Sequence, residues 1–372
     1  MQKLKDRYLK KQIIADLDQK MVFLAGPRQV GKTTLSKNLN SSSLYLNWDI
    51  DADRTAILSK EYRKADLIIF DEIHKYSSWR NYLKGLYDGI AQRQKILVTG
   101  SAKLDLLRKG GDSLQGRYFF MRLMPLSFSE LKMSNQNDLL NLYNLSGFPE
   151  PFFNGSKSYV NRWSKLYSER IVRQEISSTE LIQNLGDMEI LMNRLPDLVG
   201  SGLSINSICE DIQVTHKTLS NWLNIFEKLY SIFRISPFGS PKVKALKKQQ
   251  KLYFFDWNNI LDEGARFENL VAVHLLKWIF YMQDVEGRKM DLRYYSDKQG
   301  REVDFVVTEN NKPIQFIEVK LSDAEISKGL QYLKGKFPEV PSIQVHLKGK
   351  KEYVNQHGIE VIKACNFLKG LV

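Results

Sequence analysis

The chain has 372 residues, of which 43% are hydrophobic and 26% charged, so it is long enough for two or three ordinary globular domains. Its net charge of +13 favours acidic partners, nucleic acid first and a membrane surface second. The two cysteines, Cys209 and Cys365, lie too far apart in sequence for a metal or redox motif, which predicts a reducing compartment. The most apolar run, residues 270–281, is too short to span a bilayer. We therefore expect a cytoplasmic protein without a membrane partner.

Residues 1–20 have apolar positions at helical spacing and predict an amphipathic helix. The apolar run that follows, residues 21–25, predicts a buried strand that leads directly into a G-x-x-x-x-G-K-T segment. That segment consists of Gly26, Pro27, Arg28, Gln29, Val30, Gly31, Lys32 and Thr33, followed by Thr34. A strand before such a loop and a helix after it are typical of a phosphate-binding loop, whose backbone N–H groups surround an anion. We expect Lys32 to contact the phosphates of ATP and Thr33 to bind Mg²⁺.

Two later apolar strands end in polar residues. Residues 66–72 end in Asp71 and Glu72. In a nucleotide-binding sheet Asp71 would hold Mg²⁺, and Glu72 would polarise the attacking water. Because a kinase or a GTPase needs only the first of these acids, the pair favours ATP hydrolysis. The next strand, residues 95–101, offers Thr99 or Ser101 as a contact for the γ-phosphate, although hydroxyl residues at a strand end are equally typical of a turn.

Five strands alternating with helices, the fifth at residues 118–123, resemble the AAA+ ATPase superfamily. The segments Gly-Pro-Arg-Gln-Val-Gly-Lys-Thr-Thr, Phe-Asp-Glu-Ile-His, Thr-Gly-Ser and Gly-Arg…Pro-Leu-Ser-Phe-Ser-Glu are similar to those of a prokaryotic ATPase group with a nuclease-like C-terminal half. The resemblance implies an arginine finger that reaches the γ-phosphate of a neighbouring subunit, and hence a homo-oligomer. Arg117 is the first candidate and Arg108 the second, while a surface ion pair is the alternative role for Arg117.

The Pro- and Gly-rich residues 147–151 are typical of a boundary, so we expect an ATPase domain over 1–146 and a helical lid over 147–200. The resemblance places a second phosphate-sensing arginine in this lid, and the sequence does not rank Arg162, Arg170 and Arg173.

Residues 204–223 have the spacing of a helix-turn-helix and predict a winged-helix-like segment over 201–240, with its wing beginning at residues 230–237. The residue types suited to DNA contacts there are His216, Lys217, Ser220 and Asn221. Protein contacts are the alternative role for such a segment. A run of lysines follows and is either a phosphate-binding basic loop or a solvated charge run: Lys242, Lys244, Lys247, Lys248 and Lys251.

A predicted helix over 264–282 carries Glu268 on its apolar stripe, where a carboxylate is costly unless it is paired or binds a ligand. Residues 302–320 predict a hairpin. If its strands pair about Asn311, Asp304 lies opposite Glu318, and strand alternation puts Lys320 on the same face as Glu318. Two carboxylates this close require a divalent cation or a shared proton.

This Asp…Glu-x-Lys arrangement resembles the PD-(D/E)xK nuclease superfamily, with Glu268 as its upstream helix acid. The resemblance implies a nuclease-like domain over 241–372 in which Glu268, Asp304 and Glu318 bind Mg²⁺. Lys320 would position or deprotonate a water for phosphodiester hydrolysis. The same fold also serves as a binding module without catalysis.

The expected fold class is therefore α/β. It combines a parallel P-loop AAA+ sheet, a helical lid, a winged-helix-like middle segment and a C-terminal α/β nuclease-like domain. The expected function is an ATPase whose nucleotide cycle controls a DNA-facing nuclease-like module. The alternative is an ATP-dependent regulatory switch whose C-terminal half binds DNA or protein without catalysis. A small-molecule kinase is disfavoured by the Asp71–Glu72 pair and by the large C-terminal addition.

Overall fold

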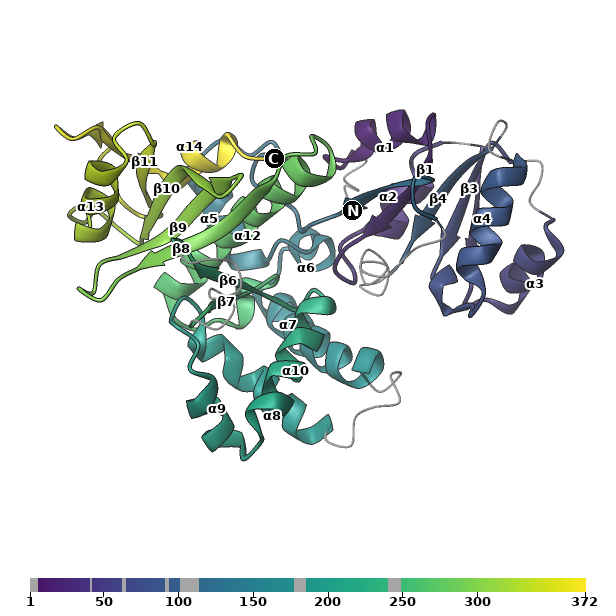
Figure 1. Ribbon diagram of the computed structural model, residues 1–372, viewed down its shortest axis with the longest axis horizontal. Helices are drawn as coiled ribbons and strands as arrows, with labels where there is room; N and C mark the ends of the chain where they lie inside the picture. Colours follow the sequence, from purple (N-terminus) through teal and green to yellow (C-terminus); the bar gives the residue numbers. More distant parts are fainter. Residues whose placement is uncertain are drawn as a thin grey trace. The chain divides into compact units, whose positions relative to one another are not determined.

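The computed structural model describes residues 6–40, 42–61, 65–90, 94–100, 114–176, 185–239 and 249–372 (Figure 1). The chain divides into two compact units. The first contains the described residues up to Met124 with the short segments Lys228–Tyr230 and Asp284–Glu286. The second contains Pro125–Glu227, Ser231–Gln283 and Gly287–Val372. Ser101, Arg108, Lys242, Lys244, Lys247 and Lys248 lie outside the described residues.

The first unit is built on a five-stranded sheet in the order β2-β3-β4-β1-β5. All neighbouring strands are parallel, which confirms the predicted parallel sheet. The strands are β1 (Met21–Ala25), β2 (Ser43–Asn47), β3 (Leu67–Asp71), β4 (Lys95–Thr99) and β5 (Tyr118–Arg122). The helices are α1 (Lys10–Leu17), α2 (Lys32–Lys37), α3 (Asp51–Ser59) and α4 (Trp79–Ile90), with a short 3₁₀ turn at Ile73–Lys75.

Two strands of this sheet are fully buried. Every residue of β1 and β3 is buried, as expected for parallel strands that are covered on both faces. Helix α4 packs Trp79, Leu83 and Leu86 into the cluster that contains Phe23 and Phe70. Because parallel strands end at one edge of the sheet, the loop after β1 and the ends of β3 and β4 meet there.

The described part of the second unit contains an eight-stranded sheet in the order β12-β13-β11-β10-β9-β8-β6-β7. Its strands are β6 (Ile232–Pro237), β7 (Lys251–Phe254), β8 (Met290–Ser296), β9 (Glu302–Glu309), β10 (Lys312–Lys320), β11 (Ser342–His346), β12 (Tyr353–Val354) and β13 (Ile359–Lys363). The helices before this sheet are α5 (Gln136–Leu145), α6 (Pro149–Asn154), α7 (Lys157–Arg170), α8 (Leu185–Arg194), α9 (Ile205–Ile212) and α10 (His216–Lys228). The later ones are α12 (Glu263–Asp284), α13 (Lys328–Lys336) and α14 (Ala364–Lys369), and short helical turns lie at Ile171–Ile176, Leu195–Leu198 and Trp257–Asn259.

The predicted helix-turn-helix forms as α9 and α10, with Leu219, Trp222, Leu223 and Phe226 buried. The predicted wing does not stand beside it as a separate element. Strand β6 pairs antiparallel with β7 and parallel with β8, so it belongs to the large sheet. Its apolar residues Ile232 and Ile235 are buried there, which gives the physical reason. The winged-helix prediction is therefore not confirmed.

The predicted hairpin forms as β9 and β10. Asn310 and Asn311 both have positive φ (50° and 65°), as a two-residue type I′ turn requires. A bulge between Pro313 and Gln315 shifts the register by one residue, after which Ile317 lies opposite Phe305. One step further along, this register puts Asp304 opposite Glu318, as predicted.

Helix α12 is fixed to β7 by Asn269, whose amide bonds both the N–H and the C=O of Phe254 at 2.7 Å. The helix also buries an ion pair between Lys277 and Glu130, 2.6 Å apart and 1% and 2% exposed at their side chains. Among the described helices, none is long and apolar enough to cross a membrane.

Candidate functional site

The backbone of the glycine-rich loop after β1 takes a conformation that requires glycine at Gly26. Gly26 has φ 141°, and a Cβ there would lie 2.2 Å from the carbonyl oxygen of Leu123. Gly31, with φ 99°, precedes α2. Lys32 donates from Nζ to the carbonyl oxygens of Gly26 and Pro27 at 2.9 and 2.7 Å, so its ammonium lies within the loop. The predicted phosphate-binding segment is therefore a compact loop between β1 and α2.

Arg7 also supports the loop, and sequence reasoning missed it. Its buried guanidinium donates to the carbonyl oxygen of Val30 at 2.5 Å and to that of Met124 at 2.6 Å. Arg7 therefore fixes the loop to the segment after β5. An arginine in a charged N-terminal stretch gives no sequence signal for such a role.

Asp71 lies at the end of β3 and its two carboxylate oxygens have different partners. The Thr99 hydroxyl donates to Oδ1 at 2.7 Å. Thr33 Oγ1 lies 3.3 Å from Oδ2, which also accepts a hydrogen bond from the Tyr45 hydroxyl. Because hydroxyl and carboxylate oxygens are the ligands that Mg²⁺ prefers, Thr33 and Asp71 fit a Mg²⁺ ion beside the loop. Of the two candidate γ-phosphate contacts, Thr99 holds Asp71 in this structure and Ser101 lies outside the described residues.

Tyr45 is a second functional candidate that sequence reasoning missed. Burial, and then its hydrogen bond to Asp71, raise the pKa of Tyr45 well above its usual value. The ammonium of Lys37 lies 3.9 Å from the centre of its ring. The tyrosine reaches Asp71 because β2 and β3 are adjacent and parallel, which the sequence of either strand alone does not reveal.

Glu72 follows Asp71 and has a left-handed backbone with φ 57°, a conformation that is costly for a residue other than glycine and is concentrated at active sites. Its N–H donates to the carbonyl oxygen of Thr99 at 3.0 Å, which fixes the turn. Its carboxylate lies 3.5 Å from both Lys75 Nζ and His74 Nε2. Burial alone would lower the pKa of Lys75, but Asp49 and Glu72 outweigh it and raise that pKa.

Arg117, the candidate finger, forms a two-pronged ion pair with Asp88 of α4, at 2.8 and 3.1 Å. Its hydrogen bond lowers the pKa of the Asp88 carboxyl. This contact is the surface ion pair expected as the alternative role of Arg117. The arginine-finger role therefore stays a prediction. Among the lid candidates, Arg173 pairs with Glu189 at 2.7 Å, while Arg162 and Arg170 are exposed.

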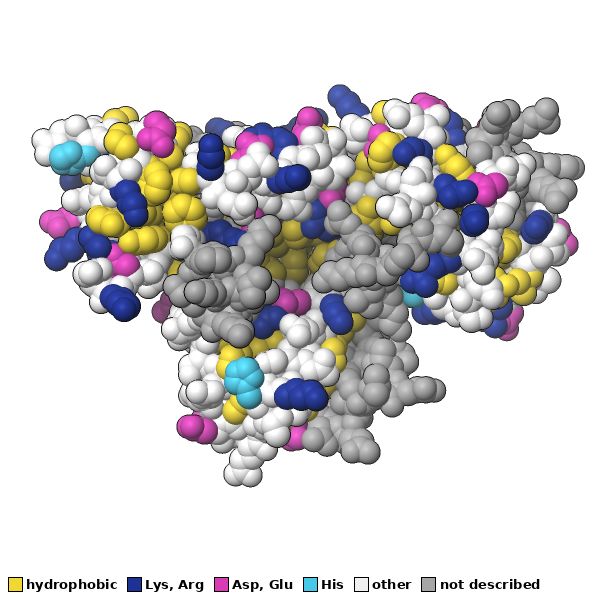
Figure 2. All heavy atoms as spheres, in the orientation of Figure 1, with side chains coloured by type: hydrophobic (Ala, Val, Ile, Leu, Met, Phe, Trp, Pro, Cys, Tyr) yellow, Lys and Arg dark blue, Asp and Glu magenta, His cyan; other side chains and the backbone are white. Residues whose placement is uncertain are grey.

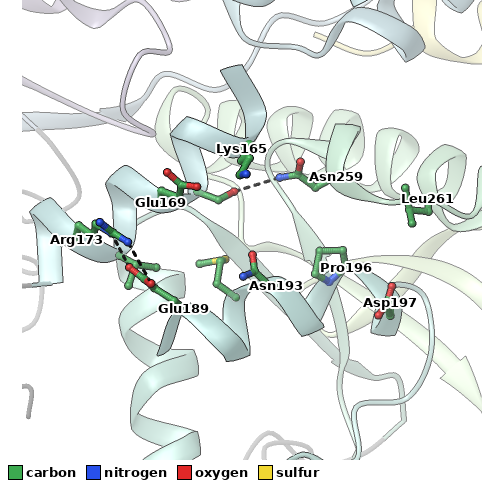
Figure 3. A pocket seen from close by; sticks show the side chains of 12 residues that line it. Lys165, Glu169, Arg173, Glu189, Asn193, Pro196, Asp197, Asn259 and Leu261 are labelled. Carbon is green, nitrogen blue, oxygen red and sulfur yellow. Dashed lines mark hydrogen bonds and ion pairs between the residues drawn. The ribbon is translucent and has the colours of Figure 1, made fainter. Parts of the chain in front are cut away.

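Arg173 and Glu189 also line a cavity of about 420 Å³ between α7 and α8 (Figure 3). The cavity is lined by Lys165, Ser168, Glu169, Val172, Arg173, Glu189, Met192, Asn193, Pro196, Asp197, Asn259 and Leu261. Most of these side chains are polar or charged, and across the cavity Asn259 donates to the Ser168 hydroxyl at 3.1 Å. None of the predicted site residues except Arg173 lies in this lining.

In the second unit, the predicted acidic residues of the hairpin do come together. Asp304 Oδ2 accepts a hydrogen bond from the N–H of Val319 at 2.9 Å, and Lys320 donates to Glu318 at 2.8 Å. Glu318 is 4% exposed, and its Oε2 has no hydrogen-bond partner within the described part of the chain. Burial raises the pKa of Glu318 to about 7, and the charge of Asp304 acts in the same direction.

Lys251 corrects one prediction. It is not part of a basic loop but the first residue of β7, with 2% exposure. Its Nζ lies 3.5 Å from Glu268 Oε1 and 3.4 Å from Asp304 Oδ1, and it forms an ion pair with Glu302. The physical reason is strand alternation, since Lys251 shares the face of Tyr253, whose hydroxyl donates to Glu268 at 2.7 Å. Although burial opposes it, the three carboxylates raise the pKa of Lys251.

The Glu268 carboxylate lies between Lys251 and the backbone at Gly200. A Cβ on Gly200, which has φ 75°, would lie 2.9 Å from Glu268 Oε2. Burial raises the pKa of Glu268 to about 8, Asp304 adds to the rise and Lys251 opposes it. Among the described residues, no group of three or more His, Cys, Asp or Glu side chains is placed to hold a metal ion. The structure therefore gives no support to the predicted Mg²⁺ site of Glu268, Asp304 and Glu318, and the Lys251 ammonium already lies beside Glu268 and Asp304.

The candidate DNA contacts lie on α10. His216, Lys217 and Asn221 are exposed, and His216 Nδ1 lies 3.3 Å from the hydroxyl of the half-buried Ser220. Figure 2 shows Lys and Arg side chains scattered among acidic ones over the visible face rather than gathered in one stripe. The net charge therefore does not mark a nucleic-acid surface on that face.

Three family profiles match parts of the chain. Residues 18–132 match one described as an AAA domain, which supports an AAA+-type P-loop ATPase in agreement with the sheet and the loop. Residues 136–257 match a domain of unknown function, DUF8612, and residues 263–367 match another, DUF4143. The C-terminal match gives no support to the nuclease resemblance.

The chain is also similar to proteins described only as uncharacterized. One, from Mycobacterium tuberculosis, is 23% identical over 332 residues, which cover 84% of this chain and 73% of the relative. Another, from Methanocaldococcus jannaschii, is 22% identical over an alignment of 414 residues, with 91% and 84% covered. Each alignment covers most of this chain, and the descriptions of these relatives name no activity.

A solved structure that matches is a signal transduction ATPase with numerous domains and a tetratricopeptide repeat sensor, from Pyrococcus horikoshii. The match covers 74% of this chain and 47% of that one, at 14% identity and a TM-score of 0.23. The chain thus spans about half the length of that protein, and so low a TM-score carries no argument about the fold.

Proposed function

We propose that this protein binds ATP with Mg²⁺ at the loop after β1, hydrolyses it, and uses the nucleotide cycle to control its C-terminal unit. The observation that carries the proposal is the convergence of Thr33 and Asp71, 3.3 Å apart, beside a loop that encloses the Lys32 ammonium. Bound ATP would supply the γ-phosphoryl group. Lys32 would hold its phosphates, Thr33 and Asp71 would hold Mg²⁺, and Glu72 would orient the attacking water once its carboxylate leaves Lys75.

The first test measures phosphate release from ATP with Mg²⁺. We expect turnover by the wild type and loss of both nucleotide binding and turnover in Lys32→Ala. Lys37→Ala is the matched control, since Lys37 lies on the same helix but stacks on Tyr45 instead of entering the loop. The proposal would be contradicted by a wild-type protein that neither binds nor hydrolyses ATP.

We further propose that Arg117 acts in a neighbouring subunit, so that the active form is a homo-oligomer. Arg117→Ala and Lys32→Ala should each be inactive alone and partly active when mixed, because each supplies what the other lacks. Asp88→Ala removes the partner of Arg117 and keeps the arginine. If Asp88→Ala loses as much activity as Arg117→Ala and the mixture stays inactive, Arg117 has only its ion-pair role.

For the second unit, we propose DNA binding without catalysis as the second part of the function. The exposed residues His216, Lys217 and Asn221 on α10 support it. Simultaneous alanine substitution of the three should weaken binding to a fluorescent duplex and reduce its salt dependence. Lys312→Ala, an exposed lysine on β10, is the control. Equal affinity of the wild type and the triple variant would favour a protein partner for α10 instead.

A further inference from the structure

We propose that the ammonium group of Lys251 is the resident cation of the acidic cluster formed by Glu268, Glu302 and Asp304, so that no divalent metal binds there. The proposal concerns the second unit alone and does not depend on ATP hydrolysis. It replaces the Mg²⁺ expected from the resemblance to metal-dependent nucleases with a cation built into the chain.

The first argument is the match between donors and acceptors. A lysine ammonium has three N–H donors, and the Lys251 nitrogen has three carboxylate neighbours. An isolated buried ammonium would be costly, so a lysine with 2% exposure requires such partners. The ring of Tyr294, whose centre lies 5.6 Å from the nitrogen, adds a further favourable contact.

The second argument is the position of the ammonium. The Lys251 nitrogen lies 3.5 and 3.4 Å from the nearest oxygens of Glu268 and Asp304, so it takes the place between these two carboxylates that a shared metal ion would need. Glu268 also accepts from the Tyr253 hydroxyl and lies against Gly200, so its carboxylate is held toward the lysine from two further sides.

The third argument is that the cation is tethered. Lys251 is a residue of β7, so its ammonium reaches the cluster without the entropy loss that a free ion pays on binding. A divalent ion would have to displace this group and leave a buried ammonium without partners. The cluster therefore prefers the lysine, and a metal-dependent cleavage of DNA at Asp304 and Glu318 is not expected.

The experiment counts Mn²⁺ bound to the full chain without nucleotide, by electron paramagnetic resonance, in an Asp71→Asn background that removes the metal ligand of the loop site. With Lys251 present we expect no bound Mn²⁺. Lys251→Met keeps the length of the side chain and should gain one Mn²⁺ per chain, which Asp304→Asn should then abolish. Lys320→Met is the matched control, because that lysine forms its ion pair with Glu318 and not with a carboxylate of the Lys251 cluster, and it should gain none.

Two results would overturn the proposal. One is Mn²⁺ bound to the chain that retains Lys251 and lost in Asp304→Asn. The other is a Lys251→Met chain that is folded by circular dichroism and binds no Mn²⁺. If Lys251→Met does not fold, Lys251→Arg keeps the charge and should still bind no Mn²⁺, while Mn²⁺ binding by Lys251→Arg would count against the proposal. Failure of the ATPase proposal would appear separately, as absent phosphate release from wild-type protein.

Discussion

The hydroxyl of Tyr45 donates a hydrogen bond to Asp71 Oδ2, the same oxygen that lies 3.3 Å from Thr33 Oγ1. In the proposed site, the oxygen that would contact Mg²⁺ therefore already accepts a hydrogen bond from a neutral donor on the adjacent strand. A hydrogen bond to a charged group contributes about 1.5–3 kcal/mol, so this contact competes measurably with the metal.

Tyr45→Phe should lower the Mg²⁺ concentration that gives half-maximal ATP hydrolysis, because Asp71 loses a competing partner in the metal-free state. The measurement is a Mg²⁺ titration of the hydrolysis rate at saturating ATP. Tyr82→Phe removes another hydroxyl of the first unit, one that donates to the carbonyl of Ile57, and should leave the titration unchanged. A weaker response to Mg²⁺ in Tyr45→Phe would instead mean that Tyr45 positions Asp71 in the metal complex.

His274 should make the second unit less stable in acid. It is buried, its Nε2 accepts from the N–H of Phe128, and its Nδ1 lies 2.8 Å from the carbonyl oxygen of Leu270. Burial lowers its pKa from 6.5 to about 4. Between these values the unfolded chain binds a proton that the folded chain excludes. The contribution of neutral His274 to the stability of the second unit is therefore complete above pH 6.5. It is lost as the pH falls toward 4, by roughly 3 kcal/mol at most.

The check is urea unfolding between pH 4 and 7. His274→Gln should lose part of the acid sensitivity, whereas His216→Gln, which changes an exposed histidine, should keep all of it. The same pH slope in wild type and His274→Gln would show that carboxylates alone cause the effect.

Lys277→Met should destabilise the second unit by about 3–5 kcal/mol, because it removes the ammonium that pairs with the buried Glu130 carboxylate. The Lys277 ammonium also donates to Ser127 Oγ and to the carbonyl oxygen of Pro125, at 2.9 and 3.0 Å. Lys348→Met, which breaks an exposed pair with Glu263, should cost less than about 1 kcal/mol. Chemical denaturation measures both, and equal costs would contradict the role given to burial.

Features of the fold that depend on the local sequence pattern could be predicted from the sequence. Continuous apolar runs located β1, β3 and β4, and an assumed pairing about Asn311 placed Asp304 opposite Glu318. The turn itself pairs Glu309 with Lys312, and the bulge between Pro313 and Gln315, which the sequence did not predict, brings the two acids opposite each other. The sequence could not predict contacts that depend on which strands become neighbours. Tyr45 reaches Asp71 only because β2 pairs with β3, and Lys251 meets Glu268 and Asp304 only once β7 and α12 are packed. The wing prediction stays unconfirmed for the same reason, since the sequence of an apolar strand does not reveal which sheet the strand joins.

The most direct test of the ATPase proposal is Glu72→Gln. The substitution keeps the size of the side chain and removes the charge that would polarise water. ATP affinity, measured by isothermal titration calorimetry, should match the wild type, while phosphate release should fall by about 10²–10⁴-fold. Equal turnover in Glu72→Gln and the wild type would contradict the account.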